Sequence, residues 1–125
     1  MTTQKHSTLE GYVCASREIS EGGHGVRFNV IKDGTVLPAF VIRHAQGSKA
    51  YINRCSHLML ELDWEPGNVF DLDGEYLICA NHGALYRPET GACVGGPCNG
   101  VALESLNMVE TDGKVYLDDP YYFLD

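Results

Sequence analysis

Two short segments of the chain combine residue types that bind metals, and each contains one cysteine and one histidine. They are Cys55-Ser56-His57 and Cys79-Ala80-Asn81-His82, with 21 residues between His57 and Cys79. Because each cysteine lies so close to its histidine, neither segment can enclose a metal alone, and the two must share one site. Two thiolates and two imidazoles suit a [2Fe–2S] centre in which the cysteines bind one iron and the histidines the other. The same ligands, Cys55, His57, Cys79 and His82, also suit a tetrahedral zinc ion.

These two kinds of site would support different chemistry. Neutral imidazole donates less charge to iron than thiolate does, so the histidine-bound iron accepts an electron more readily. Clusters with this mixed ligand set have potentials of about −150 to +300 mV, against about −400 mV for plant-type clusters with four cysteines. A structural zinc ion has no redox activity, and the usual zinc patterns pair cysteine with cysteine and histidine with histidine. Each pair is mixed here, which favours an iron–sulfur cluster that exchanges single electrons.

The elements that must position these ligands are predicted to be β-strands. Short runs rich in β-branched and aromatic residues alternate with turn signals, and no stretch has the 3.6-residue period of a long helix. A strand over 50–52 ends just before Cys55, and one over 76–78 leads directly into Cys79, so both motifs lie on loops at strand ends. The other predicted strands are Tyr12–Ala15, Val26–Lys32, Val36–Arg43, Ala84–Tyr86, Ala92–Val94, Leu106–Glu110 and Lys114–Leu117, with at most one helical turn within Ser16–Gly22.

Two Asp-Gly pairs between apolar runs predict tight hairpins. Asp33-Gly34 joins the strands over 26–32 and 36–43, and Asp112-Gly113 joins those over 106–110 and 114–117. Such pairs favour two-residue β-turns, and closely spaced turns are typical of an antiparallel sandwich or small barrel. We therefore expect an all-β fold in a single domain over residues 1–125.

Beyond the ligand types, the two motifs resemble the cluster-binding boxes of Rieske iron–sulfur proteins. Cys55-Ser56-His57-Leu58 is similar to the first box, Cys79-Ala80-Asn81-His82-Gly83 to the second, and Gly95-Gly96-Pro97 to the proline loop that covers the cluster. The resemblance implies one [2Fe–2S] cofactor and an antiparallel β sandwich with a small inserted cluster-binding subdomain at about residues 53–99. It also implies that Leu58, Tyr86 and Pro97 lie against the cluster, Leu58 as a shield from water and Tyr86 as a donor to a cysteine sulfur.

Three positions depart from the high-potential respiratory members of that family. Leu60 and Asn81 stand where those members have a further pair of cysteines, so the disulfide that ties their two boxes is absent here. Ala84 stands where they have a serine that donates a hydrogen bond to a bridging sulfide. Hydrogen bonds to cluster sulfur stabilise the reduced, more negative form, and losing one lowers the potential. We therefore expect a low-to-intermediate potential.

The resemblance and the chain length together indicate a function. A chain of 125 residues leaves no room for the catalytic domain of the oxygenases in that family. We expect a soluble one-electron carrier, a Rieske-type ferredoxin that is not itself an enzyme, passing electrons from a flavin-type reductase to an oxygenase or similar acceptor. Three alternatives stay open: a small subunit of a nitrite-reductase-like complex, a non-redox zinc-binding module, and a redox sensor whose cluster controls an interaction.

The charge of the chain limits the classes of partner that we expect. The formal net charge of −8 argues against nucleic acid, which requires a basic surface. It also disfavours anionic membranes and suits transient docking on a basic patch of a larger protein. The polar N-terminus Met1–His6 leads into no apolar run, and the longest apolar stretches are too short to span a bilayer. We therefore expect a cytoplasmic protein without a membrane segment.

Three cysteines lie outside the ligand motifs. Cys14 falls within a predicted strand and is expected to be a small core residue. Cys93 and Cys98 lie five positions apart beside the proline loop. They could pair or bind a second metal, but two buried free thiols are the favoured interpretation.

The segment Leu60–Gly74 has the composition of a surface excursion. It contains turn-forming residues and a group of acidic residues that would either be ordinary solvated side chains or steer a basic partner. These residues are Glu61, Asp63, Glu65, Asp71 and Asp73.

Overall fold

The computed structural model describes residues 11–45, 47–54, 61–63, 65–80, 83–98 and 100–125. Within these ranges the protein is almost entirely β-structure, which confirms the expected fold class, and the one helical element is a short 3₁₀ turn. No helix among the described residues has the length and apolarity needed to cross a lipid bilayer. The elements are β1 (Tyr12–Ala15), η2 (Ser16–Glu18), β2 (Val26–Lys32), β3 (Thr35–His44), β4 (Gly47–Ile52), β5 (Leu77–Ile78), β6 (Leu85–Tyr86), β7 (Cys93–Gly95), β8 (Ser105–Leu106), β9 (Met108–Thr111), β10 (Lys114–Leu117) and β11 (Phe123–Leu124).

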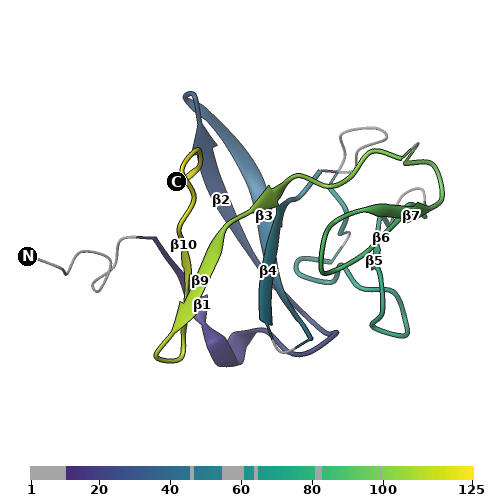
Figure 1. Cartoon of the computed structure of the whole chain (residues 1–125), viewed down its shortest axis with the longest axis horizontal. Coiled ribbons are helices and arrows are strands. Elements are labelled where there is room, and N and C mark those ends of the chain that lie inside the picture. The colour runs from purple at the N-terminus through teal and green to yellow at the C-terminus, as the bar shows by residue number, and fades with distance from the viewer. Residues whose placement is uncertain (1–10, 46, 55–60, 64, 81–82, 99) are drawn as a thin grey trace, which may run out of the picture.

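The strands form three antiparallel sheets (Figure 1). A three-stranded sheet has the order β1-β10-β9, a five-stranded sheet the order β11-β2-β3-β4-β8, and a second three-stranded sheet the order β5-β6-β7. Figure 1 shows β5, β6 and β7 as a separate lobe to the right of the other strands. Cys79, the first residue of the second cysteine motif, lies in this lobe directly after β5.

Both predicted hairpins are present. The two-residue turns have positive φ at both positions, 52° and 79° at Asp33 and Gly34 and 52° and 73° at Asp112 and Gly113. This is the conformation of the turn that best matches the right-handed twist of paired strands. The Asp-Gly pairs therefore set the register of β2 with β3 and of β9 with β10.

Strand β3 is buried on both faces, and this divides the interior into two cores. Ala39 and Val41 pack in a core between the first two sheets, whereas Phe40 and Ile42 face a second core beneath β5–β7. Because successive side chains point to opposite faces of a strand, the uninterrupted apolar run in β3 serves both cores. Strand β4 does the same, with Tyr51 on the second core.

Tyr51 also ties the β5–β7 lobe to the five-stranded sheet through a hydrogen bond. Its hydroxyl donates to the carbonyl oxygen of Pro88 at 2.6 Å, and both residues are buried. Burial is the first cause of a raised pKa at this hydroxyl, so it stays protonated as a donor. The bond anchors the turn between β6 and β7 to the five-stranded sheet.

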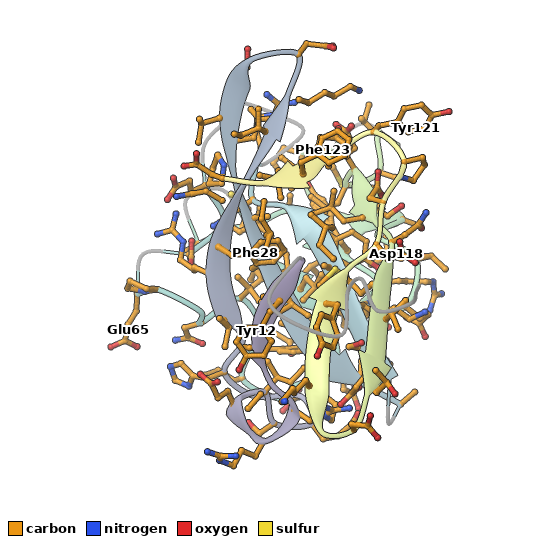
Figure 2. The ribbon with its side chains drawn as sticks, turned by 90° about the vertical axis from the view of Figure 1, so that its left-hand side faces the viewer. Tyr12, Phe28, Glu65, Asp118, Tyr121 and Phe123 are labelled. Atoms are coloured by element: carbon orange, nitrogen blue, oxygen red, sulfur yellow. A yellow bond between two sulfur atoms is a disulfide. The ribbon has the colours of Figure 1, made fainter. Side chains whose placement is uncertain are left out.

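Two elements differ from the sequence prediction. The strand predicted over 106–110 is divided at Asn107, because β8 pairs with β4 while β9 pairs with β10 in another sheet. The Asn107 N–H donates to the Asp119 carboxylate at 2.9 Å, which supports this change of sheet. Strand β11 was not predicted; it pairs with β2, and only Tyr122 beside it is buried, whereas Tyr121 and Phe123 are exposed (Figure 2).

The expectation of a surface excursion was wrong for part of the described residues 61–63 and 65–74, although Glu61, Pro66 and Leu72 are exposed. Leu62 and Val69 are fully buried, and Phe70 is nearly so, because all three close the second core. Asp63 is also buried, at 6% exposure, so it does not belong to an acidic surface. The turn-forming residues around it reverse the chain while Leu62, Val69 and Phe70 face inward and Leu72 stays exposed.

A bidentate ion pair fastens the first core at its edge. Arg43 donates from Nη2 to Glu110 Oε2 at 2.7 Å and from Nη1 to Glu110 Oε1 at 3.2 Å. Its Nη2 and Nε also donate to the carbonyl oxygens of Ser16 and Ile19. The hydrogen bond from Arg43 is the main reason why the pKa of the Glu110 carboxyl is lowered.

We predict that Glu110→Gln reduces stability in a pH-dependent way. A carboxyl whose pKa is lower in the folded state stabilises the protein above its unfolded pKa of about 4.3 and loses that effect as the pH falls towards the folded value. Since the pair is partly exposed, we expect a loss of about 0.5–1 kcal/mol at pH 7 and a smaller difference near pH 4. Urea unfolding at both pH values measures it.

The matched control is Glu104→Gln, because that carboxylate lies 3.9 Å from Arg54 Nη2 and forms only a loose pair. It should change the unfolding free energy by less than about 0.5 kcal/mol. An equal loss in the two variants would contradict the assigned role of Glu110.

Candidate metal centre

The described residues include one of the four predicted metal ligands. Cys79 is described, as are Tyr86 and Pro97, whereas Cys55, His57 and His82, together with Leu58, lie outside the described residues. The second motif is therefore located by Cys79 and the first by the residues that lead to it from β4. No three His, Cys, Asp or Glu side chains converge on one point within the ranges that are described.

Cys79 begins the loop that joins β5 to β6. Its N–H donates to the Ala84 carbonyl oxygen at 2.9 Å, and the Gly83 N–H donates to the Cys79 carbonyl oxygen at 2.8 Å. These bonds continue the ladder in which Ile78 pairs with Leu85. Gly83 has a φ of +74°, a conformation that suits glycine. The Cys79 side chain is thus 0% exposed at the end of a tightly closed hairpin.

The roots of the two motifs are tied together by the backbone of Leu62. Its N–H donates to Asn53 Oδ1 at 2.8 Å, and its carbonyl oxygen accepts from the Ala80 N–H at 2.8 Å. Asn53 lies two residues before Cys55, and Ala80 directly follows Cys79. This three-residue bridge sets the distance between the points from which both ligand loops depart.

Asn53 is fully buried and its amide is satisfied at both ends. Its Nδ2 donates to Asp63 Oδ1 at 2.8 Å while its Oδ1 accepts from Leu62. The other carboxylate oxygen of Asp63 accepts from the Gly67 N–H at 2.8 Å and lies 3.7 Å from Arg27 Nε. Because every buried polar group here has a partner, the network can rigidify the site without the cost of an unpaired buried group.

Sequence reasoning missed Asn53, Leu62 and Asp63. The signal was weak: a single asparagine directly after the apolar run 50–52, and one acidic residue among several in the segment 61–73. What distinguishes Asp63 from its neighbours is burial, and burial depends on how the segment folds back over the second core. The other acidic residues named for this segment are exposed or half-buried.

The proline loop rests on the hairpin that carries Cys79. Gly96 has a φ of +76°, and a Cβ at this position would lie 2.6 Å from the Gly83 carbonyl oxygen and 2.8 Å from Ala84 Cα. Only glycine allows the two backbones to approach so closely. Pro97 is half-buried in this loop, and Tyr86 is fully buried in the same core as Cys79 and Ala84.

Cys93 and Cys98 form a disulfide, so the interpretation as two free thiols was wrong. Strand β7 pairs with β6 in a shifted register, and the turn at Gly96 reverses the chain, which brings the two Cα atoms within 6.1 Å. Cys14, by contrast, is a buried residue of the first core, as expected. Desolvation is the first cause that raises the pKa of its thiol, to about 11.

The surroundings of Cys79 suit a cysteine-bound iron–sulfur cluster. The thiol is removed from water, its loop is held by two backbone hydrogen bonds, and the glycine-bearing loop of Gly96 lies against the same hairpin. A buried thiolate needs a positive partner such as a metal to remain charged.

Comparison with known proteins supports this interpretation. A family model for the Rieske [2Fe-2S] domain matches residues 10–110. No protein in the curated set matches the chain.

Three solved structures match over nearly their whole length. A chain from the complex of reduced oxygenase and oxidized ferredoxin in carbazole 1,9a-dioxygenase is 25% identical, with a TM-score of 0.64 over 86% of this chain and 99% of that one. The Sphingomonas yanoikuyae B1 ferredoxin is 22% identical, with a TM-score of 0.68 over 89% and 99%. The ferredoxin of carbazole 1,9a-dioxygenase from Nocardioides aromaticivorans IC177 is 20% identical, with a TM-score of 0.66 over 90% and 99%. At these last two identities the likeness concerns the fold.

We predict that Asn53→Ala destabilises the protein and loosens the metal centre. The change leaves the Leu62 N–H and an Asp63 oxygen without their buried partners, which costs about 2–3 kcal/mol. Urea unfolding measures this loss, and the rate at which a chelator removes metal from the purified protein should rise in parallel.

Asn68→Ala is the control from the same region, since Asn68 is exposed and only weakly bonded, at 3.4 Å, to Glu65. It should leave both measurements near the wild-type values. If Asn53→Ala lost stability but released metal no faster than Asn68→Ala, the bridge would not position the ligand loops.

Proposed function

The chain belongs to the Rieske [2Fe-2S] domain family, and we propose that within it the protein is a stand-alone ferredoxin of the cytoplasm. It carries single electrons from a flavin-type reductase to an oxygenase or a similar acceptor. Its cofactor is the [2Fe–2S] cluster of the family, and electron transfer rather than substrate conversion is its role.

The observation that carries this proposal is the extent of the structural match. The alignments span 99% of three chains, two of them ferredoxins and one from an oxygenase–ferredoxin complex. Longer chains from related complexes are matched over only about 30% of their length. The likeness thus extends over a whole carrier rather than one part of a larger enzyme, and the oxygenase partner is taken from the complexes in which such carriers occur.

We assign the cluster to four side chains. Cys55 and Cys79 bind one iron, and His57 and His82 bind the other. The bound cluster supplies a one-electron couple, and the protein supplies a fixed and partly dry site for it. Cys79 is already buried in the described residues, and the Leu62 bridge links Ala80 beside it to Asn53, two residues before Cys55. Leu58, Tyr86 and Pro97 complete the enclosure in this proposal.

The proposed organisation is one domain over residues 1–125 with a cluster-binding subdomain at about 53–99. The β5–β7 lobe has its own core, but that core includes Phe40 and Tyr51 from the five-stranded sheet. The lobe is therefore built on the sandwich and shares its core with it.

The surface charge supports transient docking on a basic partner. The net charge is −8, and Glu61, Glu65 and Asp73 are exposed in the segment that flanks the second core. Complementary charge speeds the encounter of such partners and makes it sensitive to salt. A fast, salt-sensitive complex suits a carrier that must meet a reductase and an acceptor in turn.

Direct analysis of the purified protein tests the cofactor and the role. We expect two irons and two sulfides per chain, visible absorption, and a paramagnetic signal after one-electron reduction. A flavin reductase should reduce the protein, and the reduced protein should support turnover by a Rieske oxygenase. Colourless protein that holds zinc after anaerobic reconstitution with iron and sulfide would exclude the proposal.

We predict that His57→Cys either prevents cluster assembly or lowers the potential towards that of all-cysteine clusters, about −400 mV. A thiolate stabilises ferric iron more strongly than an imidazole does, so the oxidised form is favoured. Protein-film voltammetry and visible spectra measure both outcomes. His24→Cys is the control, because His24 is exposed and outside the motifs; an unchanged potential in His57→Cys would contradict imidazole ligation.

We predict that Ala84→Ser raises the potential. Ala84 is fully buried and its backbone is bonded to Cys79, so a hydroxyl added here is directed into the cluster's surroundings. One hydrogen bond to a charged acceptor contributes about 1.5–3 kcal/mol; because only the part gained on reduction shifts the potential, we expect a rise of less than about 130 mV for a one-electron couple. Voltammetry of Ala92→Ser, a half-buried alanine beside the same hairpin, provides the control. A potential that stays the same or falls would refute this placement of Ala84.

A further inference from the structure

A second redox-active group lies beside the proposed cluster site and has no part in holding it. The disulfide between Cys93 and Cys98 closes a small ring around the loop that contains Gly95, Gly96 and Pro97. The respiratory Rieske proteins tie their two ligand loops to each other, whereas this bond ties strand β7 to the far end of the proline loop. Its function must therefore be sought in that loop.

The ring holds the proline loop against the hairpin of Cys79. Gly96 lies within the ring, and its backbone approaches Gly83 and Ala84 so closely that no Cβ fits between them. Those two residues in turn form the backbone hydrogen bonds with Cys79. A change in the ring is thus one contact away from a proposed iron ligand.

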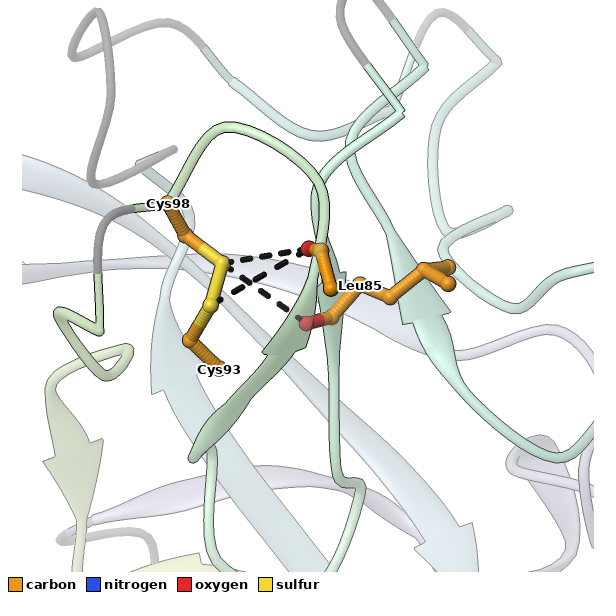
Figure 3. Close-up of a disulfide and its surroundings, with 4 residues drawn as sticks. Leu85, Cys93 and Cys98 are labelled. Atoms are coloured by element: carbon orange, nitrogen blue, oxygen red, sulfur yellow. Dashed lines mark hydrogen bonds between the residues drawn. A yellow bond between two sulfur atoms is a disulfide. The ribbon is translucent and has the colours of Figure 1, made fainter.

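The sulfur atoms occupy surroundings that suit thiols as well as a disulfide. Cys98 Sγ lies 3.2 Å from the Gly95 carbonyl oxygen and 3.9 Å from that of Leu85, and Cys93 Sγ lies 4.0 Å from the Gly95 oxygen (Figure 3). A disulfide sulfur has no proton, so these contacts can act as hydrogen bonds only after reduction. The reduced Cys98 would find an acceptor in place, and stabilising the dithiol makes a disulfide easier to reduce.

One end of the disulfide is also partly exposed, and its short ring adds little entropic stabilisation to the folded protein. Cys93 is half-buried on β7, at the edge of the sheet β5-β6-β7, whereas Cys98 is 1% exposed. Cys93 is therefore the more accessible of the two residues and the one that we expect an attacking thiolate to reach. A ring closed over a sequence separation of five restricts the unfolded chain less than a long loop does.

We propose that Cys93 and Cys98 form a second redox couple of this protein, a two-electron thiol switch that releases the proline loop from the Cys79 hairpin when a dithiol reduces it. A thiolate of the dithiol attacks Cys93 Sγ, breaks the bond between the two cysteines and leaves Cys98 as a thiolate, which takes a proton. The second thiol of the reductant then displaces Cys93, which is protonated in turn. Two electrons and two protons pass to the protein, and the reductant becomes a cyclic disulfide.

The switch makes the exposure of the cluster site to water depend on how reducing the thiols around the protein are. With the disulfide closed, Gly96 stays on Gly83 and Ala84 and covers their side of the hairpin. With the dithiol, Gly95 keeps its ladder position opposite Leu85 and Cys98 stays in the core, but Gly96 and Pro97 between them lose the covalent closure and are held by non-covalent contacts such as the hydrogen bond from the Cys98 N–H to the Gly96 oxygen at 3.0 Å. The site then opens to water without unfolding of the sandwich.

The test combines thiol labelling with hydrogen exchange on the cluster-loaded protein. The protein is equilibrated with mixtures of reduced and oxidised dithiothreitol, alkylated without denaturant and digested, and each cysteine peptide is quantified by mass spectrometry. We expect Cys93 and Cys98 to become labelled together and reversibly, while Cys14 stays protected. Amide exchange in peptides that contain residues 83–84 and 95–101 should become about tenfold faster on reduction, with no change in β2 and β3.

The double variant Cys93→Ser/Cys98→Ser is the matched control, because it should exchange as fast as the reduced wild type and should not respond to dithiothreitol. If it does not fold, the wild-type titration decides alone. Disulfide reduction only after unfolding, or a purified protein whose two thiols cannot be oxidised to the bond, would overturn the couple. Reduction without faster exchange at 83–84 would overturn the release of the loop. These readouts do not depend on electron transfer, so they stand apart from a failure of the proposed carrier function.

Discussion

The backbone of Leu62 is the constraint on which the rest of the metal site depends. The two ligand motifs follow β4 and β5, and these strands belong to different sheets, so no strand ladder holds them together. A third segment does so, because Leu62 accepts from Ala80 and donates to Asn53. Its own side chain is fully buried, which prevents the bridge from sliding. The rigidity of the site therefore depends on the packing of Leu62 and on the buried amide of Asn53.

The hydrogen bonds around this bridge explain how the carboxylate of Asp63 can be buried. Burying a carboxylate such as Asp63 is costly unless each of its oxygens is satisfied, and here both are, by Asn53 and by Gly67. The respiratory relatives use a disulfide between their boxes, and this chain has Leu60 and Asn81 at those positions. A hydrogen-bonded bridge can serve the same purpose without a covalent bond, provided that every buried group in it is paired.

The sandwich supports the site through strands that face two cores at once. Phe40 and Tyr51 pack beneath the β5–β7 lobe, while their neighbours Ala39 and Ala50 pack in the first core. A shift of either strand would therefore disturb both interiors, since packed interiors transmit strain. The lobe also returns to the sheet through Tyr51 and Pro88. In this way a small, loop-rich unit acquires the rigidity that a redox site needs to keep its geometry in both oxidation states.

The strand boundaries near the proposed ligands and the two Asp-Gly turns could be predicted from the sequence, because each depends on neighbouring residues. The ladder after Ile78 and the positive φ at Asp33 and Gly34 are local consequences of residue type. The burial of Asp63, the division of the chain at Asn107 and the pairing of Cys93 with Cys98 could not be predicted, because each depends on contacts between segments whose relative position no local pattern specifies. The sequence does not tell whether an aspartate is exposed or buried, or whether two cysteines are free or bonded. These outcomes depend on how the segments fold over a shared core.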